Sequence, residues 1–231
     1  MLRVEKVRRW IIAIDGQSGA GKSTVAKRIA KQLGYLYIDT GAMYRAIGLK
    51  ALRDNPMLND PERIISIARA SAIELKESPK GCQVFLDGID VTEDIRKEPV
   101  SQAASIVSGI SAVRKVLVQA QQKMGLKGGV VMEGRDIGTK VFPNADLKVF
   151  LDASEKTRAN RRHKENQRKG VTLTLDETIA EIHERDQRDS RRVDSPLVKA
   201  EDAVYVDSSD KTIEEVVQEI MRRWKRWNHS S

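Results

Sequence analysis

Residues 10–24 read Trp-Ile-Ile-Ala-Ile-Asp-Gly-Gln-Ser-Gly-Ala-Gly-Lys-Ser-Thr. The apolar run over residues 10–15 predicts a strand that is buried on both faces. Residues 16–23 match the pattern G-x-x-x-x-G-K-[ST] in full, and apolar residues at helical spacing predict a helix over residues 22–33. A glycine-rich loop between a buried strand and a helix is typical of a P-loop, and this context argues against a chance match.

The loop predicts a site for a nucleoside triphosphate. Its glycines let backbone N–H groups wrap the β-phosphate, and the dipole of the following helix adds positive potential. Lys22 can then reach the β- and γ-phosphates, and Ser23 can ligate Mg²⁺. The residues of the loop expected to bind ATP are Gly16, Gln17, Ser18, Gly19, Ala20, Gly21, Lys22, Ser23 and Thr24. The acceptor stays open, since GTPases, motor ATPases and small-molecule kinases share this loop.

Outward from the loop, apolar strands alternate with amphipathic helices. Further strands are expected at residues 35–38, 129–132, 147–151 and 203–206, and further helices at residues 41–53, 112–124 and 212–227. This alternation predicts an α/β fold in which helices cover both faces of a five-stranded parallel sheet. Alternating apolar residues over residues 73–91, with the turn Asp87-Gly88, predict a small antiparallel insertion at the edge of the sheet.

The composition fits one globular domain of 231 residues, with 40% hydrophobic and 32% charged residues. Cys82 is the only cysteine, which excludes an internal disulfide and a cysteine-based metal site. The apolar run that ends at Asp15 is too short for a signal peptide or a membrane span, so we expect a cytoplasmic location and no membrane partner. The net charge of +8 fits a nucleic-acid binder, a membrane-surface binder or an enzyme that handles polyanions.

Two arginines follow predicted strands. Arg45 lies in the segment 39–45 after the second strand, and Arg135 lies in Glu-Gly-Arg-Asp at residues 133–136 after the third. Ligands of doubly wound sheets sit at the carboxyl ends of the strands, where these segments and the P-loop converge. Taken alone, the segment at 39–45 is equally well explained as an ordinary helix start.

A charged stretch between residues 155 and 192 predicts two basic helical faces. Arg158, Arg161 and Arg162 share one face, and Arg185, Arg188, Asp189 and Arg192 share a second face beyond Gly170. Cations so close together repel each other unless an anion binds them, which predicts a lid over residues 155–175 that closes on phosphates. The alternative is a solvated, charged helical hairpin stabilised by ion pairs. The P-loop favours the lid, because it brings to the site a polyanion that the arginines can bind. Arg161 and Arg162 are therefore predicted to act on the transferring phosphoryl group, and Arg158 to bind ATP.

These motifs resemble those of bacterial cytidylate kinases, within the nucleoside monophosphate kinases. The resemblance covers residues 12–220 and includes the P-loop, the segments 39–45, 134–139, 149–154 and 185–192, and Ser-Pro-Leu at residues 195–197. It implies phosphorylation of CMP and dCMP by ATP with Mg²⁺, in pyrimidine nucleotide metabolism. Glu133 stands where the family usually has aspartate, and Thr40 stands where some members have serine.

The resemblance also implies residue roles. An acceptor-binding insertion would span residues 63–100. The residues that would bind CMP are Thr40, Tyr44, Arg45, Ser105, Arg114, Arg135, Asp136, Arg185, Asp189 and Arg192. Within this set, Arg45, Arg135 and Arg192 would contact the phosphate, Arg185 and Asp189 the sugar hydroxyls, and Ser105, Arg114 and Asp136 the cytosine.

The predicted reaction is in-line phosphoryl transfer without a general base, because the acceptor phosphate oxygen is already anionic at neutral pH. One rival is a kinase for another small acceptor, such as another nucleotide or shikimate. Another is a nucleic-acid-binding P-loop ATPase, but the 4% aromatic content and the clustering of arginines near the motifs argue against a nucleic-acid partner. We expect a monomer.

Overall fold

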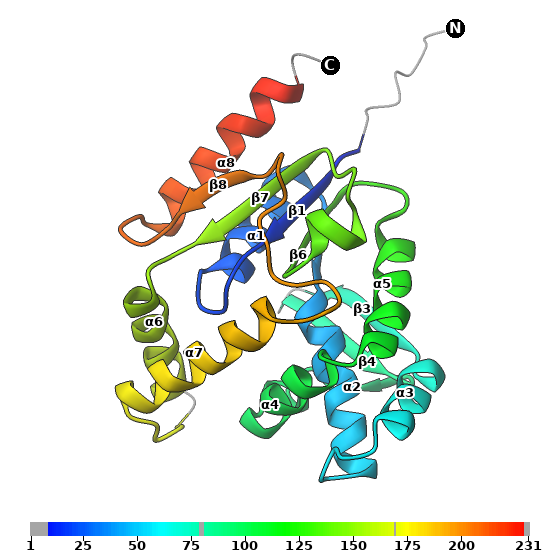
Figure 1. The fold of residues 1–231 in the computed structure, drawn as a ribbon. Coiled ribbons are helices and arrows are strands. Elements are labelled where there is room, and N and C mark those ends of the chain that lie inside the picture. The colour runs from blue at the N-terminus through cyan, green and yellow to red at the C-terminus, as the bar shows by residue number, and fades with distance from the viewer. Residues whose placement is uncertain (1–8, 79–80, 169, 229–231) are drawn as a thin grey trace, which may run out of the picture.

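The computed structural model describes residues 9–78, 81–168 and 170–228. Its centre is a five-stranded sheet in the order β2-β6-β1-β7-β8, with every neighbouring pair parallel (Figure 1). The strands are β1 (Ile11–Asp15), β2 (Leu36–Asp39), β6 (Val130–Gly134), β7 (Leu147–Asp152) and β8 (Val204–Asp207). The predicted α/β fold is confirmed, with strand limits within about two residues of those expected.

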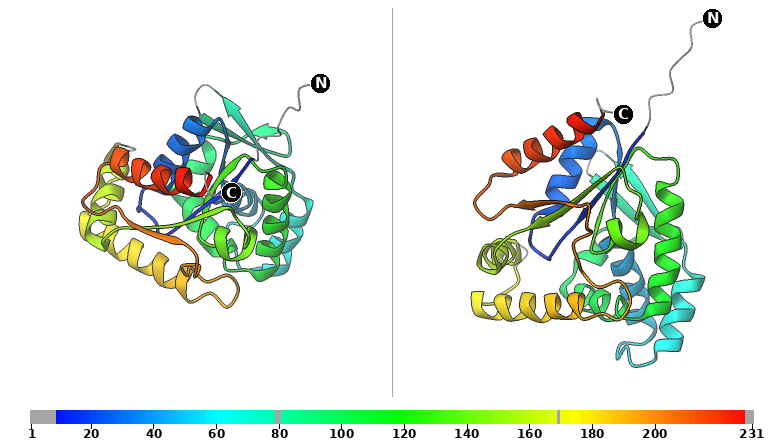
Figure 2. Two further views of the ribbon diagram at one scale, coloured as in Figure 1. Left: turned by 90° about the horizontal axis from the view of Figure 1, so that it is seen from above. Right: turned by 45° about the horizontal axis from the view of Figure 1, so that its top comes forward.

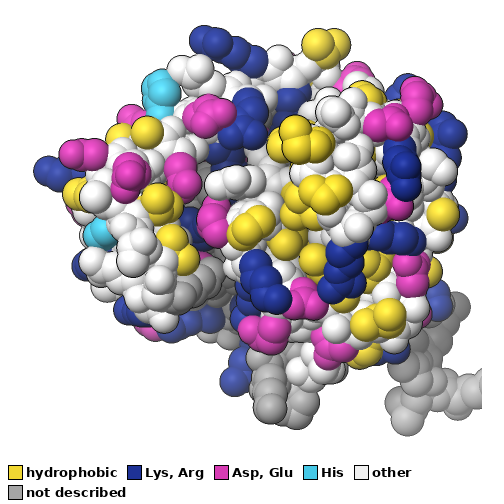
Figure 3. Space-filling view, turned by 90° about the horizontal axis from the view of Figure 1, so that it is seen from below, with side chains coloured by type: hydrophobic (Ala, Val, Ile, Leu, Met, Phe, Trp, Pro, Cys, Tyr) yellow, Lys and Arg dark blue, Asp and Glu magenta, His cyan; other side chains and the backbone are white. Residues whose placement is uncertain are grey.

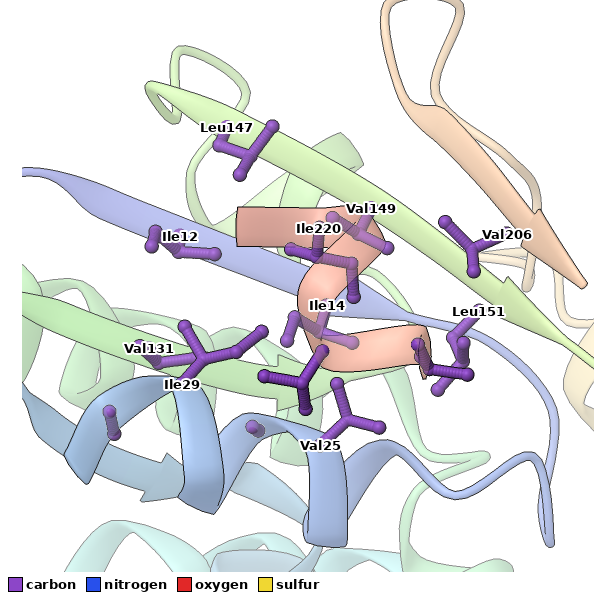
Figure 4. Packing of buried hydrophobic residues seen from close by; sticks show 14 of the residues in the cluster. Ile12, Ile14, Val25, Ile29, Val131, Leu147, Val149, Leu151, Val206 and Ile220 are labelled. Atoms are coloured by element: carbon purple, nitrogen blue, oxygen red, sulfur yellow. The ribbon is translucent and has the colours of Figure 1, made fainter. Parts of the chain in front are cut away.

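One face of the sheet is covered by α1 (Lys22–Leu33) and α8 (Ile213–Asn228). Figure 4 shows Val25 and Ile29 of α1 and Ile220 of α8 packed over Ile12 and Ile14 of β1. Because side chains alternate along a strand, Ala13 points to the opposite face. There it joins a second cluster with Ile38 and Met132, beneath α5 (Ser111–Gly125). The central strand is thus buried on both faces, as its continuous apolar run predicted.

The second strand leads into α2 (Thr40–Asp54). Hydrophobic residues between positions 58 and 124 pack against this helix. Val84 and Leu86 of a three-stranded antiparallel sheet pack against α2. This sheet comprises β3 (Ile73–Ser78), β4 (Gly81–Leu86) and β5 (Ile89–Asp90). Asp87 and Gly88 both have positive φ, at 53° and 81°, as a two-residue hairpin turn requires. The predicted antiparallel insertion is therefore present.

Two helices of this region were not predicted. α3 (Pro61–Ala70) begins after Asp60, whose side chain accepts the N–H of Arg63, and α4 (Glu98–Val107) has a proline in its first turn. Both starts carry the usual signals of a capping residue or an early proline. A short 3₁₀ turn, η1 (Asp94–Arg96), precedes α4, and a π-helical turn, η2 (Ile137–Val141), follows β6.

The charged stretch forms two helices that contact each other, α6 (Glu155–Arg168) and α7 (Leu175–Ser190). Thr174 and Glu177 make a reciprocal capping box at the start of α7. Figure 2 shows α6 and α7 on one side of the molecule and α2 to α5 on the other in both views. Among the described residues no single helix is long and apolar enough to cross a membrane. Helices α4 and α5, with a bend of 101° between them, meet the criteria of length and composition only when they are taken together.

Candidate active site

A cavity of about 720 Å³ lies between the carboxyl ends of the strands and the helices α2, α4, α6 and α7. The P-loop lines one part of it, and residues of α2, α4, β6 and α7 line the rest. Parallel strands place the segments that follow β1, β2 and β6 at the same edge of the sheet. The three motifs predicted to converge therefore share one cavity.

The P-loop has the backbone geometry that its glycines predicted. Gly16, Gly19 and Gly21 have φ of 146°, 80° and 94°, and a Cβ on Gly16 would lie 1.9 Å from the carbonyl oxygen of Leu151. Of the nine residues expected to bind ATP from this loop, six line the cavity: Ser18, Gly19, Gly21, Lys22, Ser23 and Thr24. The other three, Gly16, Gln17 and Ala20, are not among the residues that line it.

Lys22 is buried and its Nζ donates to the carbonyl oxygen of Gln17 at 2.6 Å. Burial, and then the nearby charge of Arg135, lower the pKa of Lys22 to about 7. An anion in the cavity would relieve this penalty, because a negative charge stabilises the protonated amine. The electrostatics of Lys22 therefore favour an occupant with negative charge.

Two carboxylates lie in register beside Lys22, Asp39 on β2 and Glu133 on β6. Asp39 caps α2 through the N–H of Ala42 and accepts from Arg45 at 2.8 Å. Glu133 accepts from the hydroxyl of Tyr37, and its backbone carbonyl accepts from Thr40 at 2.8 Å. Burial, and then the charge of Asp39, raise the pKa of Glu133. Tyr37 was not among the predicted site residues, since it lies inside a strand whose apolar pattern explained it.

The donor set here fits Mg²⁺. The described residues contain no cluster of three or more histidine, cysteine or carboxylate groups that would enclose a metal. Ser23 and Glu133 nevertheless bring a hydroxyl and a carboxylate oxygen to the same cavity, next to the P-loop. Mg²⁺ prefers few protein oxygens and takes its other ligands from water and phosphate. A metal–triphosphate complex therefore suits this site better than a free ion.

A buried ion pair between α5 and the segment that follows β6 lies in the wall of the cavity. Arg114 of α5 donates to Asp136 at 2.5 Å, and its guanidinium lies 5.3 Å from the ring centre of Tyr44. Ser105, the third residue predicted to contact cytosine, accepts from Arg188 of α7 at 3.0 Å. The structure thus brings Ser105, Arg114 and Asp136 into one cavity, together with Tyr44.

Asp189 links two of the predicted phosphate-binding arginines. Its carboxylate accepts from Nε of Arg135 at 2.8 Å and from Arg192. Burial opposes the charge on Asp189, but Arg135 and Arg192 outweigh it and lower the pKa. Arg185 also lines the cavity, and burial followed by the charge of Arg135 lowers its pKa to about 10. The cations that line this cavity include Lys22, Arg45, Arg135, Arg185 and Arg192.

Two buried residues that no motif indicated hold this arrangement. Ser108, just after α4, accepts from Arg192 at 2.9 Å with its hydroxyl and from Arg114 at 3.3 Å with its carbonyl. Asp15, the last residue of β1, accepts the N–H groups of Ile137 and Gly138 at 2.8 and 2.7 Å. It therefore fixes the chain directly after Asp136. Only contacts between distant segments could have revealed either role.

The lid arginines have different surroundings. Arg161 lines the cavity and donates to the carbonyl oxygen of Ser208 at 2.7 Å. Arg162 also lines it and donates to Glu98, at the start of α4, at 2.9 Å. Arg158 is buried behind the P-loop and is not among the residues that line the cavity. Direct contact between Arg158 and ATP was predicted from the basic face of the charged stretch, and it stays a prediction.

The antiparallel insertion contributes little to the cavity wall. Of the described residues between 63 and 100, Arg96 lines the cavity, whereas Ser101, Ala104, Ser105 and Ser108 of α4 and its C-terminal turn follow that range. The lid range contributes Arg161, Arg162, Lys164, Glu165 and Arg168. The sheet β3-β4-β5 instead packs on α2 and so supports the helix that carries Tyr44 and Arg45.

Comparison with known proteins identifies related sequences and a similar fold. Residues 12–226 match the family model described as cytidylate kinase. A cytidylate kinase of Caldanaerobacter subterraneus subsp. tengcongensis is 54% identical over 209 residues, covering 90% of this chain and 92% of that protein. One of Bacillus subtilis is 50% identical over 214 residues, covering 93% and 96%. An uncharacterized protein from Eubacterium ventriosum has a similar fold, with a TM-score of 0.51 at 13% identity, covering 95% and 99%.

Proposed function

The chain belongs to the cytidylate kinase family, and on that premise we propose that it transfers the γ-phosphoryl group of ATP to CMP and dCMP. The products are ADP and CDP or dCDP, in pyrimidine nucleotide metabolism. A cytoplasmic location and a monomeric state are expected of it and stay predictions.

The observation that carries this proposal is the continuity of one cavity. Lys22 and the P-loop line its donor part, and the arginines 45, 135, 185 and 192 line its acceptor part. A kinase of this kind must hold two phosphate groups with their reacting atoms about 3–3.5 Å apart. A single cavity with cations along its length meets this requirement, whereas two separate pockets would not.

In the proposed reaction an oxygen of the acceptor phosphate attacks the γ-phosphorus of ATP. The bond to the β–γ bridging oxygen breaks, and that oxygen leaves with ADP. The attacking oxygen already carries negative charge, so the chain supplies no general base. Lys22, Arg161 and Arg162 stabilise the charge on the transferring group, and the lid excludes water. Ser23 and Glu133 would hold the Mg²⁺ that binds with ATP, and the ion would neutralise further charge on the phosphates.

The acceptor would be read by the side chains at the other end. Asp136 accepts from the 4-amino group of cytosine, while Arg114 and Ser105 bind the remaining polar atoms of the ring. Asp189 and Arg185 hold the sugar hydroxyls, and Thr40, Tyr44, Arg45, Arg135 and Arg192 surround the phosphate. Two carboxylates, Asp39 and Asp189, hold three of these arginines in place. The incoming phosphate then shares donors that are already oriented.

The fold is divided between these tasks. We assign residues 63–100 to the acceptor-binding insertion, where the small sheet supports α2, and residues 155–175 to the lid. Helix α7 follows the lid range and adds Arg185 and Asp189 to the acceptor side. ATP is the phosphoryl donor in this assignment, bound by the P-loop residues.

A coupled assay with a panel of acceptors tests the proposal. CMP and dCMP should be phosphorylated fastest, UMP more slowly, and shikimate not at all. Lys22→Ala should lower kcat by about 10²-fold or more in a folded protein, because it removes a cation from the developing charge. Faster turnover of another acceptor would replace the substrate assignment, and ATPase activity stimulated by RNA or DNA would favour the rival class.

A further inference from the structure

Arg158 connects three separate segments behind the P-loop. Its side chain is 4% exposed, and its Nη1 donates to the carbonyl oxygen of Ser18, in the P-loop, at 3.2 Å. Its Nε donates to the carbonyl oxygen of Ala153, between β7 and α6, at 3.0 Å. It also forms a buried ion pair with Asp186 of α7. One guanidinium therefore touches the donor loop, the base of the lid and the helix of the acceptor site.

The P-loop is packed directly on this arginine. A Cβ on Gly19 would lie 3.0 Å from both the Cβ and the carbonyl oxygen of Arg158. Arg161, one turn later, lies against Ser208 and the carbonyl oxygen of Ala20. The first turns of α6 are thus held to the back of the P-loop, and a shift of one requires a shift of the other.

At its other end the connection reaches the acceptor site. Asp186 precedes Asp189 by three residues on α7, which places the two carboxylates on neighbouring parts of one helix face. Asp189 holds Arg135 and Arg192, and Arg185 lines the cavity next to Asp186 in the chain. Helix α7 therefore faces the P-loop through Asp186 and the acceptor through Arg185 and Asp189.

We propose that Arg158 and Asp186 are a positioning pair that couples the two nucleotide sites, so that ATP and CMP each raise the affinity for the other. ATP orders the P-loop, whose Ser18 carbonyl then fixes Arg158, and Arg158 fixes α7 through Asp186. The coupling is reciprocal because it is a free energy shared by both binding equilibria. This inference rests on the proposed function, since it takes ATP and CMP as the ligands.

The simpler explanation is that the pair only stabilises the lid. Breaking a buried ion pair is destabilising whatever else it does, so a lower unfolding temperature decides nothing. A matched contact separates the two explanations. His183 of α7 lies 3.2 Å from Glu155 of α6, so it joins the same two helices, but the contact is at the surface. Charged side chains of both signs are interspersed over much of the molecule's surface, seen here from below (Figure 3).

The experiment measures the Kd of CMP by calorimetry, without and with a saturating non-hydrolysable ATP analogue. It compares the native chain with Asp186→Asn, Arg158→Lys and the control His183→Gln. Asp186→Asn keeps the shape of the side chain and loses its charge, while Arg158→Lys keeps a cation but cannot reach Ser18, Ala153 and Asp186 together. We expect the analogue to tighten CMP binding about fivefold or more in the native chain and control. In the two variants that ratio should fall to within about twofold of one.

Each outcome decides the proposal. It is overturned if the native ratio is one, if both variants keep the native ratio, or if the control loses it equally. It is also overturned if either variant loses affinity for the ATP analogue alone, since Arg158 or Asp186 would then belong to the binding site itself. Should one variant fail to fold, the other decides. If the native chain binds no CMP, the proposed function is wrong. If it binds both nucleotides independently of each other, only the proposed coupling is wrong.

Discussion

The carboxylate of Asp136 and the guanidinium of Arg114 form an ion pair at 2.5 Å, with both side chains buried. Asp136 follows β6 and Arg114 belongs to α5, so the pair joins the end of the sheet to a covering helix. Both residues were expected to contact cytosine. Their pairing occupies Oδ2 of Asp136 and orients the carboxylate before any base arrives.

The first prediction concerns selection of the base. Cytosine has an amino donor at position 4 where uracil has a carbonyl acceptor, and a carboxylate favours the donor. Asp136→Asn should therefore narrow the CMP:UMP ratio of kcat/KM by about tenfold, since such contacts discriminate by about 1–3 kcal/mol. Arg192→Lys is the control, because Arg192 is expected to contact the phosphate that CMP and UMP share, so both substrates should lose activity equally. An unchanged ratio in Asp136→Asn would mean that the base is read elsewhere.

The second prediction concerns pH. In the free protein the pKa of Lys22 is lowered to about 7, so its protonated fraction falls about tenfold for each pH unit above that value. Hence kcat/KM for ATP should decline as pH rises from 7 to 9, whereas kcat should stay flat because bound phosphates restore the proton. Lys22→Arg keeps its charge, so its lower kcat/KM should not vary over the same range. A native profile that is flat in kcat/KM would contradict the role of Lys22.

The third prediction separates two roles of Arg162. Arg162→Ala should lower kcat by about 10²-fold with little change in the Kd of CMP, because the cation acts on the transferring group. Its partner Glu98 provides the control, since Glu98→Gln breaks the ion pair and leaves the arginine in place. Glu98→Gln should keep kcat within about threefold. An equal loss in both variants would show that Arg162 acts only by holding α4.

The fourth prediction concerns Ser108, whose hydroxyl accepts from Arg192 and donates to the carbonyl oxygen of Ser105 at 2.9 Å. Ser108→Ala removes both bonds with a small change of volume, at a cost of about 1–3 kcal/mol in acceptor binding. We expect a raised KM for CMP and UMP by the same factor, with kcat retained, because Arg192 contacts the phosphate that both share. A loss confined to CMP would place Ser108 in base recognition instead.

The fifth prediction concerns Asp15. Burial raises its pKa to about 6, against 3.8 for an ordinary aspartate, although the N–H groups of Gly138 and Ile137 lower it. The folded protein therefore holds this proton where the unfolded chain releases it. The stability that this contributes is present in full below about pH 4 and is lost as pH rises to about 6.

We compare the unfolding free energy of the native protein with that of Asp15→Asn at each pH. The difference between them should be about 3 kcal/mol more favourable to the native protein at pH 4 than at pH 7. Urea unfolding of both proteins at intervals of one pH unit measures this difference. If the difference between the two proteins does not change over this range, Asp15 is already ionised in the fold, and the carboxylate that anchors η2 carries its charge.

Patterns in the amino-acid sequence were enough to predict the sheet, the P-loop and the ends of the strands at which ligands gather. Those features depend on patterns within one segment: an apolar run in β1, helical spacing in α1, and glycines where φ must be positive. Such patterns are local, so they can be recognised without knowing which other segments pack against them. The capping box at Thr174 and the turn at Asp87-Gly88 were predictable for the same reason.

Tertiary structure alone decided which charged groups meet. Spacing places Arg158 on one helix face and Asp186 on another, but not against each other, and the same holds for Arg162 with Glu98. No local pattern indicated the contact of Asp15 with Ile137 or of Ser108 with Arg192, because these partners lie 122 and 84 residues away in the chain. An ion pair or hydrogen bond depends on distances of a few ångströms between packed elements, and local periodicity leaves those distances undetermined.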